Sequence, residues 1–521
     1  MLRRQRAAMY GSRIAALTSV MTLALAGVVA VAPGAQAAAC SFPTPDPLPS
    51  ADGLIQDAAD LQWLRDTRSA WSGSWMQTAN IDMGDCEWGS GIGDVTTEFA
   101  GTYDGNSNLI SGLTVSGSSY VGLFGLATGT IREVSFSGAV SGTDGFIGGI
   151  VGYLSSGTVD SSSMTGSVAA TTGNGINVGG IVGTALAATI TDSHSSATIS
   201  VEEGNVGGVV GFLSASDLNG ASFSGSVTAS VDVVGGLVGY FGGLPGSALS
   251  DSYSTGTVMG RDKVGGAVGQ ALSGSIDRVY STGSVTGTDV GSTYVGGLVG
   301  LNSSDIGARL GGATIADSYA RGAVVGNNVV GGLVGWTDAV ISRSYATGAV
   351  NANSSRGGLI GIAGPSAVAS FWDTETTGES SSAGGSGKTT SQMTSLSTFY
   401  DASWSIAQGY DPSKTWGMDP DINDGYPYLI SLSSGSQPVS VNRATYEFTF
   451  WLDSGEQCTD ISPQTVQSGA AFTLPGAMAG CRREGTEIVG WTIPWSDRVF
   501  APGTVVRVVD SQQFTAVLKE P

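Results

Sequence analysis

Glycine-rich apolar phrases return along the chain at nearly constant intervals. The phrase Gly-Gly-apolar-Val/Ile-Gly begins at residues 148, 179, 207, 235, 265, 296, 331 and 357, and the variant VGLFG at 121–125 precedes the series. The copies begin 26 to 35 residues apart. A repeat of this length is typical of a solenoid, in which successive repeats stack along one axis.

A second pattern indicates strands in fixed register. In eight consecutive repeats an apolar residue is followed nine positions later by another, from Ile131 and Val140 to Ile341 and Val350. Variation in repeat length falls outside this pair, so we expect insertions in loops. A large residue stands four or five positions after the first apolar one, and we expect these residues to form one column: Phe136, Met164, His194, Phe223, Tyr253, Tyr280, Tyr319 and Tyr345.

The repeats resemble a known family. GGLVG phrases followed by LSDSYSTGTV at 249–258 or ISRSYATGAV at 341–350 resemble the GLUG repeats of bacterial surface and secreted proteins. The resemblance covers roughly residues 51–430. It implies an all-β fold, a parallel β-helix or similar β-solenoid used for display or adhesion, and it implies no single reaction.

The repeat glycines have two interpretations. Glycine permits a tight bend or a close backbone approach at a corner of the coil. Alternatively, the apolar residue between the glycines forms an exposed stripe for binding or self-association. We treat the following glycines as structural: Gly148, Gly152, Gly179, Gly183, Gly207, Gly211, Gly235, Gly239, Gly265, Gly269, Gly296, Gly300, Gly331, Gly335, Gly357 and Gly361.

Stacking predicts two columns of side chains about 4.8 Å apart along the axis. An aromatic column, either structural or facing a carbohydrate, ends in Tyr253, Tyr280, Tyr319 and Tyr345. A charge column lies two residues after each first apolar position. Its last four members alternate in sign and would fix the register of neighbouring coils: Asp251, Arg278, Asp317 and Arg343.

The N-terminus predicts export. Residues 1–39 contain four arginines, an apolar run and a small-x-small site at 35–37, which together read as a secretory signal peptide. A lipoprotein site at Cys40 is an alternative. The chain should therefore be secreted, with retention at the cell surface left open. In an oxidising compartment we expect the local disulfides Cys40–Cys86 and Cys458–Cys481.

Composition changes divide the chain further. We expect an N-terminal cap with a short helix and the first coils at 40–118, the repeat solenoid at 119–378, its C-terminal cap at 379–430, a linker at 431–440 and a small β domain at 441–521. The pattern YEFTFWLDSG, FTLPG, EIVGW in the last region resembles the β-grasp-like Listeria-Bacteroides repeats of surface proteins.

The charged residues exclude some functions. The formal net charge of −21 and the absence of a basic cluster after Arg13 argue against nucleic acid. No metal or cofactor motif is complete, and the one histidine, His194, occupies a repeat position. Acidic residues are dense only in the N-terminal region, where turn and cap roles explain them: Asp82, Asp85, Glu87, Asp94, Glu98 and Asp104.

The sequence thus predicts an adhesin-like binding or display module, not an enzyme, without cofactors. Its partner would be an extracellular glycan, a matrix protein or a cell-surface protein, and we expect no transmembrane segment in the mature chain. Two alternatives stay open: a β-helix polysaccharide lyase or glycoside hydrolase, and a structural surface stalk.

Overall fold

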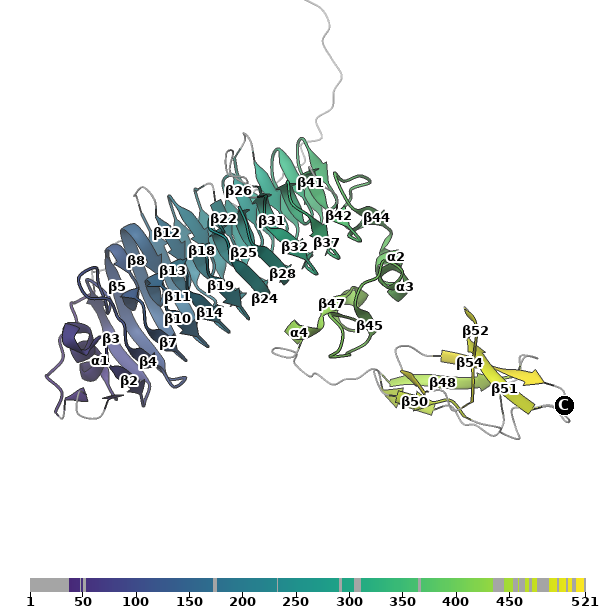
Figure 1. Ribbon diagram of the computed structural model, residues 1–521, viewed down its shortest axis with the longest axis horizontal. Coiled ribbons are helices and arrows are strands. Elements are labelled where there is room, and N and C mark those ends of the chain that lie inside the picture. The colour runs from purple at the N-terminus through teal and green to yellow at the C-terminus, as the bar shows by residue number, and fades with distance from the viewer. Residues whose placement is uncertain are drawn as a thin grey trace, which may run out of the picture. The chain divides into compact units, whose positions relative to one another are not determined.

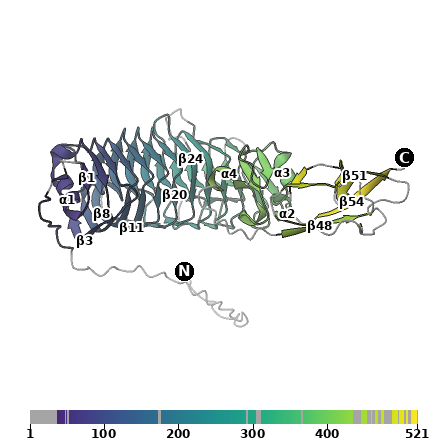
Figure 2. The same ribbon diagram turned by 90° about the horizontal axis from the view of Figure 1, so that it is seen from below.

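The protein was analysed as a computed structural model. It describes residues 37–46, 48–49, 53–171, 176–231, 233–289, 293–303, 311–363, 367–433, 445–452, 458, 464–467, 471–475, 487–493, 496–502, 505–507 and 512–519. Residues 1–36 of the predicted signal peptide and Cys481 lie outside these residues, as does most of the predicted linker. Figure 1 shows the repeat region as a stack of coils, and Figure 2 shows the same stack with α1 (Ala58–Asp66) at its first coils.

Each coil is a ring of short strands, and every strand pairs in parallel with its counterpart in the next coil. The predicted all-β solenoid is therefore confirmed. The strand that follows each glycine pair belongs to a nine-stranded sheet, here called sheet B: β6 (Phe124–Ala127), β9 (Val151–Ser155), β13 (Val182–Leu186), β18 (Val210–Ser214), β23 (Val238–Phe241), β27 (Val268–Ala271), β31 (Val299–Asn302), β36 (Val334–Thr337) and β41 (Ile360–Ala363).

The other walls of the coil form one 35-stranded sheet. The strands before the glycine pairs are β5 (Leu109–Val121), β8 (Ser135–Gly148), β12 (Asn177–Gly179), β17 (Asn205–Gly207), β22 (Val233–Gly235), β26 (Lys263–Gly265), β30 (Tyr294–Gly296), β35 (Val329–Gly331) and β40 (Arg356–Gly357). The strands after sheet B are β7 (Thr130–Arg132), β10 (Thr158–Asp160), β14 (Thr189–Thr191), β19 (Asp217–Asn219), β24 (Ala248–Ser254), β28 (Ser275–Ser281), β32 (Thr314–Ala316), β37 (Ile341–Ser342) and β42 (Ala367–Val368).

The coil is completed by two further rows. One contains β11 (Ser163–Ala170), β15 (His194–Ser195), β20 (Ser222–Phe223), β33 (Tyr319–Ala320), β38 (Tyr345–Ala346), β43 (Phe371–Asp373) and β44 (Ser386–Lys388). The other contains β16 (Thr198–Val201), β21 (Ser226–Ala229), β25 (Thr257–Gly260), β29 (Val285–Gly287), β34 (Val324–Val325) and β39 (Val350–Asn351).

The predicted strand register is confirmed. The first apolar residues pair from coil to coil, as Val159 does with Ile131 and Ile190. The second apolar residues pair in the same way, as Val168 does with Val140 and Ile199. Both columns are buried. A nine-residue spacing therefore holds two walls of the core at a fixed separation, and loop length varies elsewhere.

The glycine pairs form a corner between the flanking strand and sheet B. A Cβ on Gly179 would lie 2.0 Å from the carbonyl oxygen of Val182, and one on Gly180 would lie 2.1 Å from that of Gly208. No side chain fits at such distances. The apolar residue after the pair, such as Ile181 or Leu298, is fully buried. The corner interpretation is therefore right, and the expectation of an exposed stripe at this position is wrong.

The predicted charge column is a second corner. All eight residues two positions after the first apolar residue have a left-handed backbone, with φ between 45° and 67°. That conformation is unfavourable for most side chains. Here it is supported by backbone hydrogen bonds to the next coil, as from Asp317 N to the carbonyl of Ser342 at 3.1 Å.

The single column of large residues must be divided in two. His194 pairs with Ser163 and Ser222, whereas Met164 pairs with Phe136 and Ser195. Positions four and five residues after the first apolar residue lie on opposite faces of the strand, because side chains alternate. Phe136, Met164 and Phe223 fill the core, while His194 and the four tyrosines lie on the outer face.

An N-terminal cap covers the first coils. Helix α1 begins after Asp57, whose side chain accepts hydrogen bonds from the backbone of Ala59 and Asp60, and it buries Leu61 and Leu64. A 3₁₀ helix (Arg68–Ala70), β1 (Leu54–Ile55), β2 (Ser74–Gln77), β3 (Ile81–Trp88) and β4 (Thr102–Asp104) complete this end. The predicted Cys40–Cys86 disulfide is present and joins the segment before α1 to β3.

The C-terminal cap returns to the outer face of the solenoid. It contains α2 (Thr390–Met393), α3 (Leu396–Tyr400), β45 (Ile406–Gln408), β46 (Trp416–Met418), the 3₁₀ helix η3 (Asn423–Gly425), β47 (Tyr428–Leu429) and α4 (Ile430–Ser433). The cap thus continues three residues past the predicted boundary at 430.

The last region is a separate β structure. Its described strands are β48 (Thr445–Trp451), β49 (Gln464–Gln467), β50 (Ala471–Thr473), β51 (Glu487–Ile493), β52 (Ser496–Phe500), β53 (Val505–Arg507) and β54 (Gln512–Lys519), arranged as a five-stranded and a two-stranded sheet. Phe450 and Trp491 are buried together. Cys458 is buried and disulfide-bonded. The resemblance to Listeria-Bacteroides repeats stays a prediction.

Candidate functional site

The four predicted tyrosines form a ladder on the outer face. Neighbouring rings of Tyr253, Tyr280, Tyr319 and Tyr345 are 4.8 to 5.0 Å apart and 2° to 8° from parallel. Both faces of the inner rings are therefore occupied by other rings. We call these four residues the tyrosine ladder.

The C-terminal cap covers half of this ladder. Tyr319 and Tyr345 are 4% and 0% exposed, and they belong to a core with Trp404, Trp416 and Tyr426. The Tyr345 hydroxyl donates to the carbonyl oxygen of Pro427 at 2.6 Å. Burial raises the pKa of Tyr345 far above its usual value. This part of the ladder is a docking surface for the chain itself, so it cannot be a carbohydrate platform.

Charged residues hold the cap on the solenoid. Arg321 binds the backbone and side chain of Asn423 and forms an ion pair of 2.7 Å with Asp424. The indole nitrogen of Trp416 donates to Asp317 at 2.9 Å, and Tyr426 donates to Asp373 at 2.7 Å. The acidic turn that precedes β47 therefore contributes to docking, a role that sequence reasoning missed.

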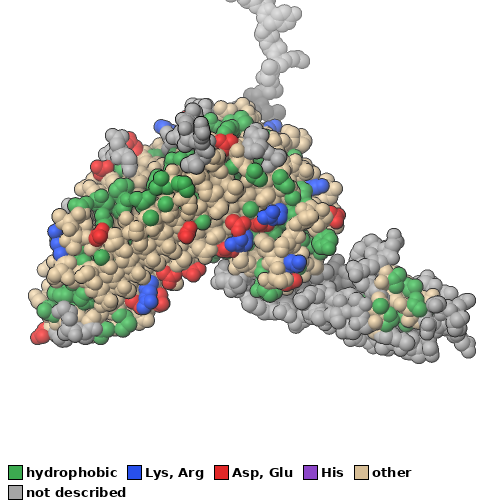
Figure 3. Space-filling view, viewed as in Figure 1, with side chains coloured by type: hydrophobic (Ala, Val, Ile, Leu, Met, Phe, Trp, Pro, Cys, Tyr) green, Lys and Arg blue, Asp and Glu red, His purple; other side chains and the backbone are tan. Residues whose placement is uncertain are grey.

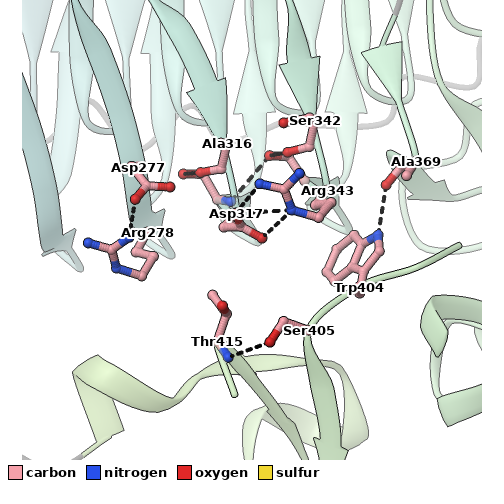
Figure 4. Close-up of polar contacts among 12 residues, drawn as sticks. Asp277, Arg278, Ala316, Asp317, Ser342, Arg343, Ala369, Trp404, Ser405 and Thr415 are labelled. Atoms are coloured by element: carbon pink, nitrogen blue, oxygen red, sulfur yellow. Dashed lines mark hydrogen bonds and ion pairs between the residues drawn. The ribbon is translucent and has the colours of Figure 1, made fainter. Parts of the chain in front are cut away.

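The predicted charge column forms two separate ion pairs. Arg278 binds Asp251 through two nitrogens at 2.8 and 2.6 Å, and Arg343 binds Asp317 at 2.5 Å. Arg278 also contacts Asp277, which sequence reasoning did not consider (Figure 4). Burial alone would raise the pKa of Asp251, but hydrogen bonds from Arg278 and its neighbours lower it below its ordinary value.

Two cavities lie between the ladder and the cap. One of about 210 Å³ is lined by Tyr280, Tyr319 and residues of β47, and one of about 390 Å³ by Arg278 and residues around Lys414. The hydroxyl of Tyr428 is buried and has no hydrogen-bond partner among the described residues. A third cavity of about 600 Å³ lies on the N-terminal cap beside Arg68 and Asp94.

Two acidic residues of the N-terminal region and the one histidine have local structural partners. Asp94 pairs with Arg68 and accepts hydrogen bonds from its own turn, and Asp104 pairs with Arg132. The ring nitrogen Nδ1 of His194 is 2.7 Å from the Ser222 hydroxyl, and burial lowers its pKa. Within the described ranges, no group of three or more metal-binding side chains occurs, and no helix could span a membrane.

Sheet B carries an outward column that sequence reasoning missed. The third residue of each sheet-B strand is in register from coil to coil. Most of these residues are partly exposed, with Thr184 the exception at 4%, whereas the next residue along the strand, such as Leu154 or Phe241, is fully buried. We call them the sheet-B column: Leu126, Tyr153, Thr184, Phe212, Tyr240, Gln270, Leu301, Trp336 and Ile362.

A second column flanks it across the glycine corner. It contains Tyr120, Phe146, Asn177, Asn205, Val233, Lys263, Tyr294 and Val329. Contacts between columns include the ring of Tyr153 with that of Phe146 at 4.9 Å, and a hydrogen bond from Asn177 to Thr184. Together the two columns form the outer stripe. Figure 3 shows a band of hydrophobic side chains with few charges over this part of the solenoid.

Comparison with known proteins agrees with the repeat assignment. The GLUG motif family matches residues 174–200, which contain the β12 corner and the strands to β16. The match supports a GLUG-repeat protein. No curated protein matches the sequence.

Two solved structures are similar to this chain at low identity. One is a crystal structure of a candidate immunoglobulin A1 protease from Bacteroides ovatus, with 21% identity and a TM-score of 0.31, covering 73% of this chain and 92% of that one. The other is an IgA1 protease, with 15% identity and a TM-score of 0.27. It covers 61% of this chain, which spans only 21% of that protein.

These names correct one expectation. The prediction that the protein is not an enzyme is contradicted by two structural neighbours named as proteases, and we withdraw it. At TM-scores of 0.31 and 0.27 the similarity assigns no reaction or substrate to this chain.

Proposed function

We propose that the protein is an exported, adhesin-like module that binds an extracellular partner through the outer stripe. The observation that carries this proposal is the stripe itself: seven of the nine coils hold a large apolar or aromatic side chain in register in the sheet-B column, on a face that no described element covers. Soluble proteins rarely expose continuous apolar patches of this kind unless they bind something. The stripe persists through many repeats, so it is a property of the repeat and not of one irregular coil.

The tyrosine ladder is the other aromatic surface of the solenoid, and it is less suited to bind a partner. Its covered half is already occupied by the cap, so it leaves little aromatic surface for a partner. The predicted signal peptide supports export. The acidic composition repels polyanions, so proteins and neutral glycans are the better candidates for the partner.

The test is a retention assay on immobilised glycans, matrix proteins and the protein itself. We compare wild type with Phe212→Ser/Tyr240→Ser, which removes two neighbouring rings of the sheet-B column. The matched control is Met259→Ser/Val325→Ser, which removes two side chains exposed by 43% and 41% elsewhere on the solenoid.

We expect wild type and the control pair to be retained on at least one surface and the stripe variant to be lost from it. Retention that is equal for all three proteins, or retention on no surface, would contradict the proposal. Thermal unfolding of each variant verifies that the solenoid is intact.

A further inference from the structure

Aromatic rings of the outer stripe pack against one another along the solenoid. Phe212 and Tyr240 are stacked on each other at 5.1 Å and 14°. Tyr153 packs against Tyr120 and Phe146 at 5.9 and 4.9 Å. A sugar ring binds best over an open aromatic face, and each of these five rings already packs against a neighbouring ring. Such clustered rings, with aliphatic side chains between them, suit packing against protein side chains.

The spacing of the stripe restricts which protein surface fits. Its side chains repeat about every 4.8 Å, the distance between neighbouring parallel strands. A surface that matches this spacing over nine coils must have the same repeat. A second copy of the solenoid has it by construction, whereas a globular partner would match only a few coils.

The order of side chains along the sheet-B column is self-complementary. Polar residues stand at the third and sixth positions, Thr184 and Gln270, and large apolar residues stand at the others. A twofold axis between Phe212 and Tyr240 places the polar third coil of one copy opposite the polar sixth coil of the other. The same axis pairs Tyr153 with Leu301 and Leu126 with Trp336. Isologous dimers require such self-complementarity.

Charge and area agree with a weak dimer. The sheet-B column has no charged residue, and Lys263 in the flanking column is paired with Asp262 at 2.8 Å. Two acidic chains can therefore meet here without direct repulsion. Eight coils are paired about this axis, and their seven steps of about 4.8 Å with a width of about 13 Å give roughly 440 Å² per copy, or about 900 Å² in total, the size of a weak, transient contact.

We infer that the partner of the outer stripe is a second copy of this chain, bound antiparallel about an axis between the coils of Phe212 and Tyr240. This inference rests on the proposed function and names the partner of the same site. The consequence is contact between identical molecules, either free or on neighbouring surfaces, that increases with concentration.

Sedimentation velocity of the purified protein over a range of concentrations tests the dimer. We expect a reversible monomer–dimer equilibrium that is at least tenfold weaker in Phe212→Ser/Tyr240→Ser and unchanged in Met259→Ser/Val325→Ser. The inference is overturned if the wild-type protein is monomeric at every concentration. It is also overturned if Phe212→Ser/Tyr240→Ser dimerises as strongly as wild type. If such a monomer still binds a glycan or matrix protein through the stripe, the proposed function stands and only the self-association fails.

A charge design tests the antiparallel arrangement. In Thr184→Lys/Gln270→Glu, opposite charges meet across the proposed axis, whereas in Thr184→Lys/Gln270→Lys like charges meet. Both variants share the change at Thr184, so any cost to folding is matched. We expect the first to dimerise at least tenfold more strongly than the second, with the difference shrinking in high salt. Equal dimerisation, which a parallel dimer would give because like charges then meet in both variants, overturns the proposed axis, and so does the reverse order.

Discussion

The solenoid has two rows of outward-facing aromatic side chains, and they differ in what covers them. The tyrosine ladder lies under the C-terminal cap over half its length, with Tyr345 fully buried. The outer stripe on sheet B has no described element over it. Both rows arise from the same stacking of repeats. The difference shows that a column of aromatic residues in a solenoid has no fixed role, and that its role depends on where the chain returns after the last coil.

The cap also explains why the ladder ends in tyrosine and not in an aliphatic residue. Tyr345 needs a hydroxyl because it donates to Pro427 and accepts from Asn423 at 2.8 Å. In the outer stripe the aromatic positions alternate with Leu, Ile, Thr and Gln. A covered row is specified by polar contacts as well as by shape, whereas an open row needs only a pattern of large and small side chains.

The largest expected effect is a difference between the two rows in how much stability a tyrosine contributes. Tyr345→Ala should lower the free energy of unfolding by about 3–5 kcal/mol, because it opens a cavity in the cap interface. Tyr240→Ala in the open stripe should cost less than half as much, since its ring is partly solvated. Denaturant unfolding of both variants measures the difference. Equal losses would mean that the cap does not depend on the ladder.

The next effect tests the corner that places the two columns of the stripe side by side. A Cβ on Gly208 would lie 2.1 Å from the carbonyl oxygen of Gly236 and 2.4 Å from the ring of Phe223. Gly208→Ala should therefore destabilise the protein by about 1–3 kcal/mol, as overpacking does. Gly89→Ala is the control, because nothing lies within 4 Å of its Cβ position. A neutral Gly208→Ala would show that the corner can open.

A smaller effect concerns the charges beside the ladder. Arg278→Asp turns the attraction between residue 278 and Asp251 into repulsion. It should lower the free energy of unfolding by about 1 kcal/mol at low salt. Adding Asp251→Arg should restore part of the loss. A double-mutant cycle on thermal unfolding isolates the coupling. A coupling of zero would mean that the two side chains do not interact in solution.

The smallest effect is a dependence on pH. Because the pKa of Asp251 is lower in the folded state than in the unfolded chain, its contribution to stability is present above the unfolded pKa of about 3.9 and is lost as the pH falls through the folded value. Asp251→Asn should therefore lose less stability than wild type between about pH 5 and about pH 2. Parallel pH profiles of the two proteins would contradict this prediction.

Much of the solenoid could be predicted because repetition makes register visible. The pair of apolar residues nine positions apart aligned every coil correctly, and the alternation of Asp251, Arg278, Asp317 and Arg343 located a real corner. The aromatic column was misjudged by one residue. Positions four and five after the apolar residue look equivalent in a sequence. However, the side chain at position four points outward, whereas the side chain at position five points into the core.

The outer stripe and the cap contacts could not be predicted in the same way. The sheet-B column contains Leu, Tyr, Thr, Phe, Gln, Trp and Ile, so no single residue type marks it. It could have been found by aligning the residue after each VG of the glycine phrase. The contacts of Arg321 with Asn423 and Asp424 join segments about 100 residues apart, and a repeat pattern contains no information on such a return of the chain.

The comparison between the covered and the open row is tested most directly by hydroxyl-radical labelling of the purified protein at low and high concentration. In dilute solution we expect Tyr240 and Trp336 to react and Tyr345 to stay protected. At high concentration Tyr240 and Trp336 should become protected, while Tyr253 at the open end of the ladder keeps its reactivity. Labelling of Tyr345 as fast as Tyr240, or stripe residues whose reactivity does not change with concentration, would contradict the account.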